Sequence, residues 1–439
     1  MGLMFAATVW FGFYALALLF PLGVALLVDP IETLRPLMLE FGVALGFVAY
    51  PLMTSEFALV GRIRSVSLLY GNDVLMFFHK YMGIAALGLV VAHPLLISPG
   101  NFSQFNPFAG PSMLRYGAWC LWLLVALAVT SIYRKKMKLP YGWWMLIHYL
   151  LALGIGAMGM AHILAAKGYT SHVVVRGVMI GYFVGFLIPM IRYRFWECFR
   201  MLARPWRVID NRDEGGGVRT LLLEPVGHAG FEFHPGQFAW LSTGNPLTTE
   251  HHPISIASSA ELGPERRIEF GVRNLGDWSG TSVPQLPVGA TMYLNGPFGA
   301  FSLDREPGQG FVLVAGGIGI TPLRSMILTM RDRGEVRPVI LFYGAAEVDD
   351  LTFRDELLEL QKSMNLKVVY VLERPPQGWR GETGRISAAL LRKYLPPKQY
   401  RRWQYFICGP SPMMDAMEEL LPGLGVPQEK IHTERFDMV

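Results

Sequence analysis

The chain has 439 residues, of which 52% are hydrophobic and only 17% are charged. This length allows two or three domains, and the apolar excess indicates a membrane protein. The net charge of +5 is explained by basic residues that flank membrane spans, so no nucleic-acid partner is expected. The three cysteines are scattered without metal-ligand spacing, which argues against a cysteine metal site and against disulfides.

Six stretches before about residue 192 are long and apolar enough to cross a hydrocarbon core of roughly 30 Å. The first has no basic leader and is too long for a signal-peptide core, so we expect it to be a retained span. The six predicted transmembrane helices lie near residues 4–28, 38–60, 74–97, 114–133, 143–166 and 173–191.

Lysine and arginine residues concentrate on one side of these spans. That side carries Arg62, Arg64, Arg134, Lys135, Lys136, Lys138, Arg192, Arg194, Arg200, Arg204 and Arg207, and the other side carries Arg35, Arg115, Lys167 and Arg176. Basic loops stay in the cytoplasm. We therefore predict a multi-pass protein of the plasma membrane, surrounded by lipid, with both termini and everything after residue 192 in the cytoplasm.

Two of the apolar stretches each carry a pair of histidines. His79 and His93 are fourteen positions apart, and so are His148 and His162. Fourteen residues make about four helical turns, so each pair lies on one face of its helix, about 21 Å apart along the axis. The third and fifth spans run in the same direction, which predicts two stacked cross-helix pairs, His79 with His148 and His93 with His162.

Two imidazoles that face each other across a gap between helices can ligate a haem iron from both sides. Glycines between the ligands, at Gly83, Gly88, Gly154, Gly156 and Gly159, would let a flat macrocycle approach the backbone. The alternative for each glycine is simple helix packing. A metal-transport relay would more naturally add carboxylates, and neither histidine stretch contains one. We predict two b-type haems that pass electrons without binding substrate directly.

After residue 205 the pattern changes to short strands separated by turn-forming residues, which suits a small antiparallel barrel. From about Gly310, strands alternate with helical segments, as in a parallel α/β domain. The glycine-rich turn at Gly316, Gly317 and Gly319 follows the first of these strands and is placed to bind phosphate. We predict three domains: a six-helix membrane bundle at 1–200, an antiparallel β-barrel at 201–307 and a parallel-sheet domain at 308–439.

Five motifs follow one another in the soluble half. They are HPISIASS (His252–Ser259), GPFG (Gly296–Gly299), GGIGITP (Gly316–Pro322), CGP (Cys408–Pro410) and ERF (Glu434–Phe436). Their order resembles the ferredoxin-NADP reductase-like superfamily. With the six spans, the paired histidines and FHK at the first ligand, the chain resembles a compact prokaryotic-type member of the transmembrane ferric reductase and NADPH oxidase family.

The resemblance implies FAD and a nicotinamide nucleotide, NADPH or NADH, as cofactors. It assigns catalytic roles to Ser255 near flavin N5, to Cys408 at the nicotinamide end, and to Phe436 as the aromatic that covers the flavin. The wider cofactor-binding set that it implies is His252, Pro253, Ile254, Ser255, Gly276, Trp278, Ser279, Gly296, Gly299, Gly316, Gly317, Gly319, Thr321, Pro322, Cys408, Gly409, Pro410 and Phe436.

The chain also departs from this family. Ile254 stands where an aromatic is usual, and three residues follow Phe436. Glu347 would repel an adenosine 2'-phosphate, which leaves NADPH and NADH both open. Ile97 replaces a histidine that often follows the outer ligand in superoxide-forming members.

The resemblance implies electron transfer from cytoplasmic NAD(P)H through FAD and the haems to a small acceptor outside. We expect dioxygen, giving superoxide, with a ferric chelate as the alternative. A six-helix transporter or sensor with a regulatory nucleotide domain would also explain the topology, but not the matched histidine spacing. The sequence does not indicate an oligomeric state.

Overall fold

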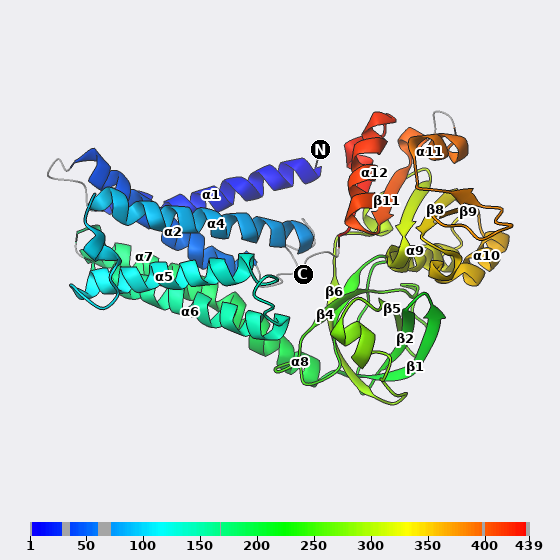
Figure 1. Cartoon of the computed structure of the whole chain (residues 1–439), viewed down its shortest axis with the longest axis horizontal. Coiled ribbons are helices and arrows are strands. Elements are labelled where there is room, and N and C mark those ends of the chain that lie inside the picture. The colour runs from blue at the N-terminus through cyan, green and yellow to red at the C-terminus, as the bar shows by residue number, and fades with distance from the viewer. Residues whose placement is uncertain (1, 29–35, 60–71, 167, 397–399, 436–439) are drawn as a thin grey trace. The chain divides into compact units, whose positions relative to one another are not determined.

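The computed structural model describes residues 2–28, 36–59, 72–166, 168–396 and 400–435. Two compact units divide the chain, one comprising residues 1–69 and 74–196 and the other residues 70–73 and 197–439. The predicted fold class is confirmed: apolar helices come first, and an antiparallel barrel and a parallel α/β sheet follow (Figure 1). The finer boundaries at residues 200 and 307 stay a prediction.

Within the described part of the chain, six helices are long and apolar enough to cross a membrane, as predicted. Large apolar side chains such as Phe13, Leu27 and Trp143 are exposed, which suits a surface that faces lipid. The helices are α1 (Gly2–Val28), α2 (Leu37–Leu59), α4 (Asn72–Ile97), α5 (Ser112–Ile132), α6 (Tyr141–Ala165) and α7 (Val173–Ile191).

The first soluble domain is a barrel of antiparallel strands that follows the short helix α8 (Glu197–Leu202). Its strand order is β4-β3-β6-β1-β2-β5, and a bridge between Ile256 and Phe270 closes the ring. Buried aromatic and branched side chains, including Trp206 and Phe270, fill its interior. The strands are β1 (Pro205–Gly215), β2 (Val218–Pro225), β3 (Phe238–Ser242), β4 (His252–Ser255), β5 (Ile268–Arg273) and β6 (Thr291–Phe298).

The second soluble domain is a parallel sheet with strand order β10-β9-β8-β7-β11-β12. The order reverses beside β7, the first strand along the chain, and ligands of such sheets bind at the carboxyl ends of the strands where this happens. The strands are β7 (Phe311–Gly316), β8 (Val339–Ala345), β9 (Leu366–Leu372), β10 (Glu382–Thr383), β11 (Gln404–Cys408) and β12 (Ile431–Thr433). The helices are α9 (Ile320–Asp332), α10 (Arg354–Ser363), α11 (Ala388–Tyr394) and α12 (Ser411–Gly423).

Helix α9 joins the two soluble domains. Residues 320–330 are all buried, because α9 contacts the sheet and also contacts the barrel. Ser325 Oγ donates to the carbonyl of Ser258 at 2.7 Å, and Thr329 Oγ1 accepts from the backbone N–H of Ala260 at 2.8 Å. These bonds hold the barrel segment that follows β4 against the nucleotide domain.

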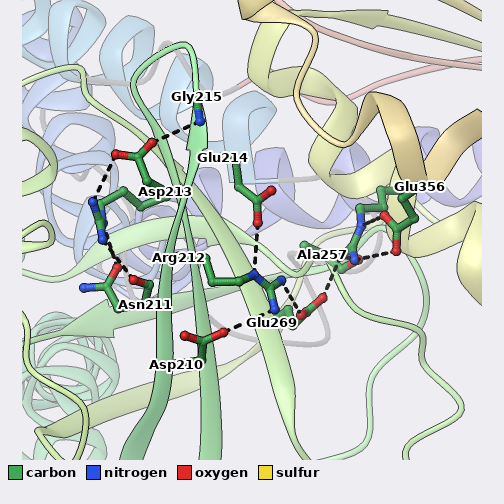
Figure 2. A network of polar contacts seen from close by, with 11 residues as sticks. Asp210, Asn211, Arg212, Asp213, Glu214, Gly215, Ala257, Glu269 and Glu356 are labelled. Carbon is green, nitrogen blue, oxygen red and sulfur yellow. Dashed lines mark hydrogen bonds and ion pairs between the residues drawn. The ribbon is translucent and has the colours of Figure 1, made fainter.

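Arg324 is the buried cation of α9, with 5% of the residue exposed. Its guanidinium donates to Glu269 Oε2 at 2.7 Å, to the carbonyl of Ala257 at 2.9 Å and to both carboxylate oxygens of Glu356. Glu269 also accepts from Arg212 of β1 at 3.2 Å, so a chain of charges runs from the barrel to α10 (Figure 2). A buried cation of this kind requires all of its partners.

Arg324→Met should lower the free energy of unfolding of the soluble half by about 3–5 kcal/mol, because Glu356 and Glu269 lose the buried cation between them. Urea-dependent tryptophan fluorescence of the full chain in detergent measures this change. Lys362→Met removes a surface pair whose partners are 71% and 72% exposed, and should change stability by about 0.5 kcal/mol or less. Equal stability of Arg324→Met and the wild type would contradict the joining role of α9.

Candidate functional site

The four intramembrane histidines form the two predicted cross-helix pairs. His79 and His93 lie on α4, and His148 and His162 lie on α6. The ring centroids of His79 and His148 are 6.2 Å apart, and those of His93 and His162 are 6.1 Å apart. The repeated spacing of the sequence thus becomes two sites of nearly equal width.

The width of each pair fits a metal ion held between two imidazoles. A metal-nitrogen bond is about 2 Å long and the ligating nitrogen lies about 1 Å from the ring centroid, so two rings on one ion have centroids about 6 Å apart. A haem iron bound on both sides requires two such axial nitrogens. Among the described residues, no group of three or more histidine, cysteine or acidic side chains forms a different kind of metal site.

The outer pair, His93 and His162, is oriented by backbone carbonyls. The Nδ1 atom of His93 lies 2.8 Å from the carbonyl oxygen of Gly42 on α2, and that of His162 lies 2.8 Å from the carbonyl oxygen of Met113 on α5. A carbonyl can only accept, so each Nδ1 carries the proton and each Nε2 keeps its lone pair. Haem-ligating histidines use their second nitrogen in this way.

The inner pair, His79 and His148, is oriented by side chains. Nδ1 of His79 forms an ion-pair contact with Glu56 Oε2 on α2. Nδ1 of His148 lies 3.3 Å from the hydroxyl of Ser131 on α5. All four rings therefore have a polar partner at Nδ1, which leaves Nε2 as the nitrogen available to a ligand.

Two glycines let the neighbouring helices approach the outer rings. A Cβ atom at Gly46 would lie 2.7 Å from Cε1 of His93, and one at Gly117 would lie 3.0 Å from Nδ1 of His162. A Cβ atom at Gly46 would force the ring of His93 to shift, and one at Gly117 would make a tight contact with the ring of His162, so glycine at both positions allows α2 and α5 to lie close to these rings.

The glycines predicted to cradle a macrocycle fall into two groups. Positions 83 and 88 have open space where a side chain would be, which suits that prediction. By contrast, Gly154 faces Leu123 of α5, Gly156 faces Phe183 of α7 and Gly159 faces Tyr50 of α2. These three glycines follow the alternative of helix packing, because their missing side chains make room for neighbouring helices.

In the barrel, the predicted flavin residues His252 and Trp278 are stacked. Their ring centroids are 4.0 Å apart with an interplanar angle of 13°, and Trp278 Nε1 donates to Thr243 Oγ1 at 3.2 Å. Burial lowers the pKa of His252 to about 4, so its ring is neutral at pH 7. Ser279 accepts from the backbone N–H of Leu275 at 2.9 Å and so closes the loop that contains Gly276.

The strand order β4-β3-β6 brings the other predicted flavin residues together. His252, Pro253, Ile254 and Ser255 form β4, while Gly296 lies near the end of β6 and Gly299 just beyond it. Ser255 is 8% exposed, and its hydroxyl makes no hydrogen bond to any residue that the structure describes. A buried hydroxyl without a protein partner is suited to a bound ligand.

The nicotinamide motifs meet at the carboxyl ends of β7 and β11, which pair in parallel with Ala315 opposite Cys408. A Cβ atom at Gly319 would lie only 2.1 Å from the carbonyl oxygen of Cys408, and one at Gly316 would lie 2.8 Å from Cδ of Pro410. Gly317 adopts φ +52°, which favours glycine. The turn and the CGP motif thus pack backbone against backbone.

Three predicted side chains of this region, those of Thr321, Pro322 and Cys408, are themselves buried. Thr321 and Pro322 lie in the first turn of α9, where Thr321 Oγ1 donates to the carbonyl of Ile318 at 2.8 Å and closes the turn. Cys408 is 2% exposed, and burial raises the pKa of its thiol well above the ordinary value, so the thiol stays protonated. Cys408, Gly409 and Pro410 thus shape the edge of the turn without a reactive thiolate.

Phe436 lies outside the described residues. Its neighbour Glu434 is described, and a Cβ atom at Gly299 would lie 2.8 Å from Glu434 Oε1. The residues before Phe436 therefore lie beside the GPFG motif of the barrel.

Sequence reasoning missed Glu56 and Ser131, which contact the inner histidines, and Arg273 of β5. The Arg273 guanidinium lies 2.8 Å from where Gly317 would carry a Cβ atom, so a cation stands beside the glycine-rich turn. An acidic residue within an apolar span is rare and marks a functional site. Glu56 could therefore have been recognised from the sequence as a candidate functional residue.

Two protein families match separate parts of the chain. Residues 45–159 match the ferric reductase like transmembrane component, and residues 313–419 match the oxidoreductase NAD-binding domain. The first match includes His79, His93 and His148, and the second includes the glycine-rich turn and Cys408.

Individual relatives cover the soluble half. The reductase component of propane 2-monooxygenase from Rhodococcus jostii (strain RHA1) is 32% identical over 228 residues, which are 50% of this chain and 60% of that protein. Ferredoxin-NADP reductase B from Sorangium cellulosum (strain So ce56) is 31% identical over 232 residues, which are 50% of this chain and 92% of that protein. The chain thus spans about 60% of the length of the monooxygenase component.

A flavohemoglobin from Malassezia yamatoensis shares the fold. Its crystal structure aligns with a TM-score of 0.50 and 16% identity, over 91% of this chain and 98% of that chain.

Gly319→Ala should raise KM for NAD(P)H at least about tenfold, or about 1.4 kcal/mol, because the new methyl group displaces the turn from Cys408. Anaerobic stopped-flow reduction of the flavin measures this effect. Gly423→Ala is the control, since a Cβ atom there would meet no atom within 4 Å. An unchanged KM in Gly319→Ala would place the nucleotide elsewhere.

Proposed function

Since this chain belongs to the ferredoxin-NADP reductase family and carries a ferric reductase-like transmembrane component, we propose that it passes electrons from NAD(P)H through FAD and two b-type haems to an acceptor across the membrane. It is an NAD(P)H-dependent oxidoreductase that binds FAD and crosses a membrane several times. The observation that carries the haem proposal is the shared geometry of the four histidines, each with a polar partner at Nδ1 and with Nε2 left for a metal.

His79 and His148 would hold one haem, and His93 and His162 the other. When bound, a haem with two histidine ligands accepts and releases one electron at a time and has no open iron position. The residues of this chain hold the rings, fix the protonated nitrogen and keep the surroundings apolar. These roles suit electron transfer. The final acceptor would then receive electrons without binding to the iron.

In the soluble half, the proposed roles follow the geometry of each motif. The neutral ring of His252 and the indole of Trp278 form one stacked wall of the flavin site, and Ser255 offers a free hydroxyl. Gly316, Gly317 and Gly319 let the nucleotide phosphates approach the start of α9, with Arg273 nearby. Cys408 shapes the nicotinamide end as a neutral thiol, and Phe436 covers the flavin until the nicotinamide replaces it.

The same proposal fixes an orientation. His148 lies near the start of α6, and α7 returns to that side before the chain enters its soluble half at residue 197. The basic loops place this side in the cytoplasm of a plasma-membrane protein. The pair of His79 and His148 is then nearer the cytoplasm, and the pair of His93 and His162 is nearer the outside.

We propose dioxygen as the acceptor, so that each NAD(P)H reduces two dioxygen molecules to superoxide and releases NAD(P)+ and one proton. The loop from Ser98 to Pro111 contains no acidic residue, and therefore offers no carboxylate ligand for free iron. A ferric chelate is the alternative acceptor.

The structure also bears on the choice between NADPH and NADH. Glu347 after β8 pairs with Arg374 at 3.0 Å, so a cation stands beside the carboxylate that was expected to repel the 2'-phosphate of NADPH. Both nucleotides therefore belong in the test.

An anaerobic visible spectrum of the purified, FAD-supplemented protein tests this function. Addition of NADPH or NADH should reduce haem bands, and dioxygen should then reoxidise them with formation of superoxide. Reoxidation by a ferric chelate alone would make the protein a ferric reductase. A preparation without haem bands would favour the transporter or sensor and refute the haem proposal.

His162→Ala should remove about half of the haem and abolish electron transfer to the external acceptor, while flavin reduction by NAD(P)H continues, because the outer iron loses an axial ligand. Haem extraction and anaerobic flavin spectra measure both effects. His172→Ala is the matched control, since His172 caps the start of α7 and is in neither pair. Full haem content in His162→Ala would refute the ligand assignment.

A further inference from the structure

Glu56 is a carboxylate inside a membrane-spanning helix. It lies in the apolar segment Leu37–Phe57 of α2, and its side chain is 12% exposed. A charged group at this depth is costly unless it is paired, and such groups mark functional positions. The contacts of Glu56 therefore identify its task.

The partner of Glu56 is His79. The contact joins Oε2 of Glu56 to Nδ1 of His79. Glu56 lies on α2, whereas the facing ring of His148 lies on α6. The side chain of His79 is 21% exposed, so most of its surroundings are protein. Glu56 thus acts on the site through the ring of His79 and not by direct contact with the space between the rings.

The other three histidines have uncharged partners. His93 and His162 face backbone carbonyls, each at 2.8 Å, and His148 faces the hydroxyl of Ser131 at 3.3 Å. Among the residues that the structure describes, a carboxylate therefore contacts a histidine of the pair His79 and His148, whereas the printed partners of His93 and His162 are backbone carbonyls. An oriented carboxylate makes an imidazole a stronger electron donor to a metal.

Two physical effects of this carboxylate have the same sign. A more basic imidazole stabilises the oxidised iron, which carries one more positive charge than the reduced iron. The negative charge of Glu56 also favours the oxidised iron, and the apolar surroundings screen this attraction weakly. Both effects lower the reduction potential of the site that contains His79.

We propose that Glu56 is a positioning residue that makes the haem site of His79 and His148 the lower-potential site of the two. This inference rests on the proposed function, because it requires haem at both pairs. Electron transfer then runs downhill from the site of His79 and His148 to the site of His93 and His162. The asymmetry gives the membrane half a direction that its repeated histidine spacing lacks.

Redox titration of the full-length, haem-loaded protein in lipid nanodiscs tests this inference, with visible absorption as the readout. The wild type should show two midpoint potentials. Glu56→Gln keeps an oxygen acceptor near Nδ1 but removes the charge. The equilibrium constant for one-electron reduction of this site should therefore increase about tenfold, which raises the lower midpoint potential by about 59 mV. The higher midpoint should stay unchanged.

Glu40→Gln is the matched control. It makes the same substitution on the same helix, but the Glu40 carboxylate accepts from the hydroxyl of Tyr169 at 3.0 Å. The lower midpoint should keep its wild-type value in this variant. An equal shift in Glu40→Gln and Glu56→Gln would overturn the inference, because any charge on α2 would then have the same effect.

A second measurement decides the order of the sites if Glu56→Gln fails to fold. His162→Ala should retain the lower-potential haem, and His148→Ala should retain the higher-potential haem. The reverse order, or unchanged midpoints in a folded Glu56→Gln protein, would overturn the role of Glu56 while the two haems remain. A wild type without haem would refute the proposed function itself.

Discussion

A histidine ring placed among apolar helices must keep its N–H paired, and this requirement organises the membrane half of the protein. Two helices that carry no paired histidine, α2 and α5, supply the partners. On α2, Gly42 and Glu56 are fourteen positions apart, the same spacing as His93 and His79, which they contact across antiparallel helices. On α5, Met113 and Ser131 serve the rings of α6. Each of the four rings thus has a polar partner at Nδ1, backbone carbonyls define the tautomer of His93 and His162, and the rings lie in two facing pairs.

The soluble half depends on a buried charge in a comparable way. Arg324 lies on a helix that is buried on all sides, and its partners come from the barrel and from α10. The resulting attachment, with the bonds of Ser325 and Thr329, holds the flavin strands and the glycine-rich turn in one arrangement. Hydride transfer requires such fixed geometry, because the two reacting rings must lie in contact. A hydrophobic contact alone would allow the domains to slide.

Both halves therefore place chemistry between elements that are distant in sequence. The histidine pairs proposed to hold haem lie between α4 and α6, and the proposed nicotinamide site lies between the turn after β7 and the segment after β11. At each place a close approach requires glycine: Gly46 and Gly117 support the outer rings, and Gly319 lies against Cys408. The apolar bundle and the soluble sheet thus meet the same two requirements: buried polar atoms are paired, and backbones come into close contact.

The sequence by itself determined the spans, the strands and the histidine pairs, because hydrophobic length, periodicity and turn residues are local properties. The ordered motifs also predicted the flavin and nucleotide segments. Only the tertiary structure decided what stands behind each ring, since Gly42, Glu56, Met113 and Ser131 come from helices other than those that carry the rings. For the same reason the sequence left two alternatives for Gly156 and Gly159: whether a glycine faces a cofactor or a neighbouring helix depends on how the helix is rotated in the bundle. Local pattern therefore predicted the ligands, and long-range packing set their surroundings.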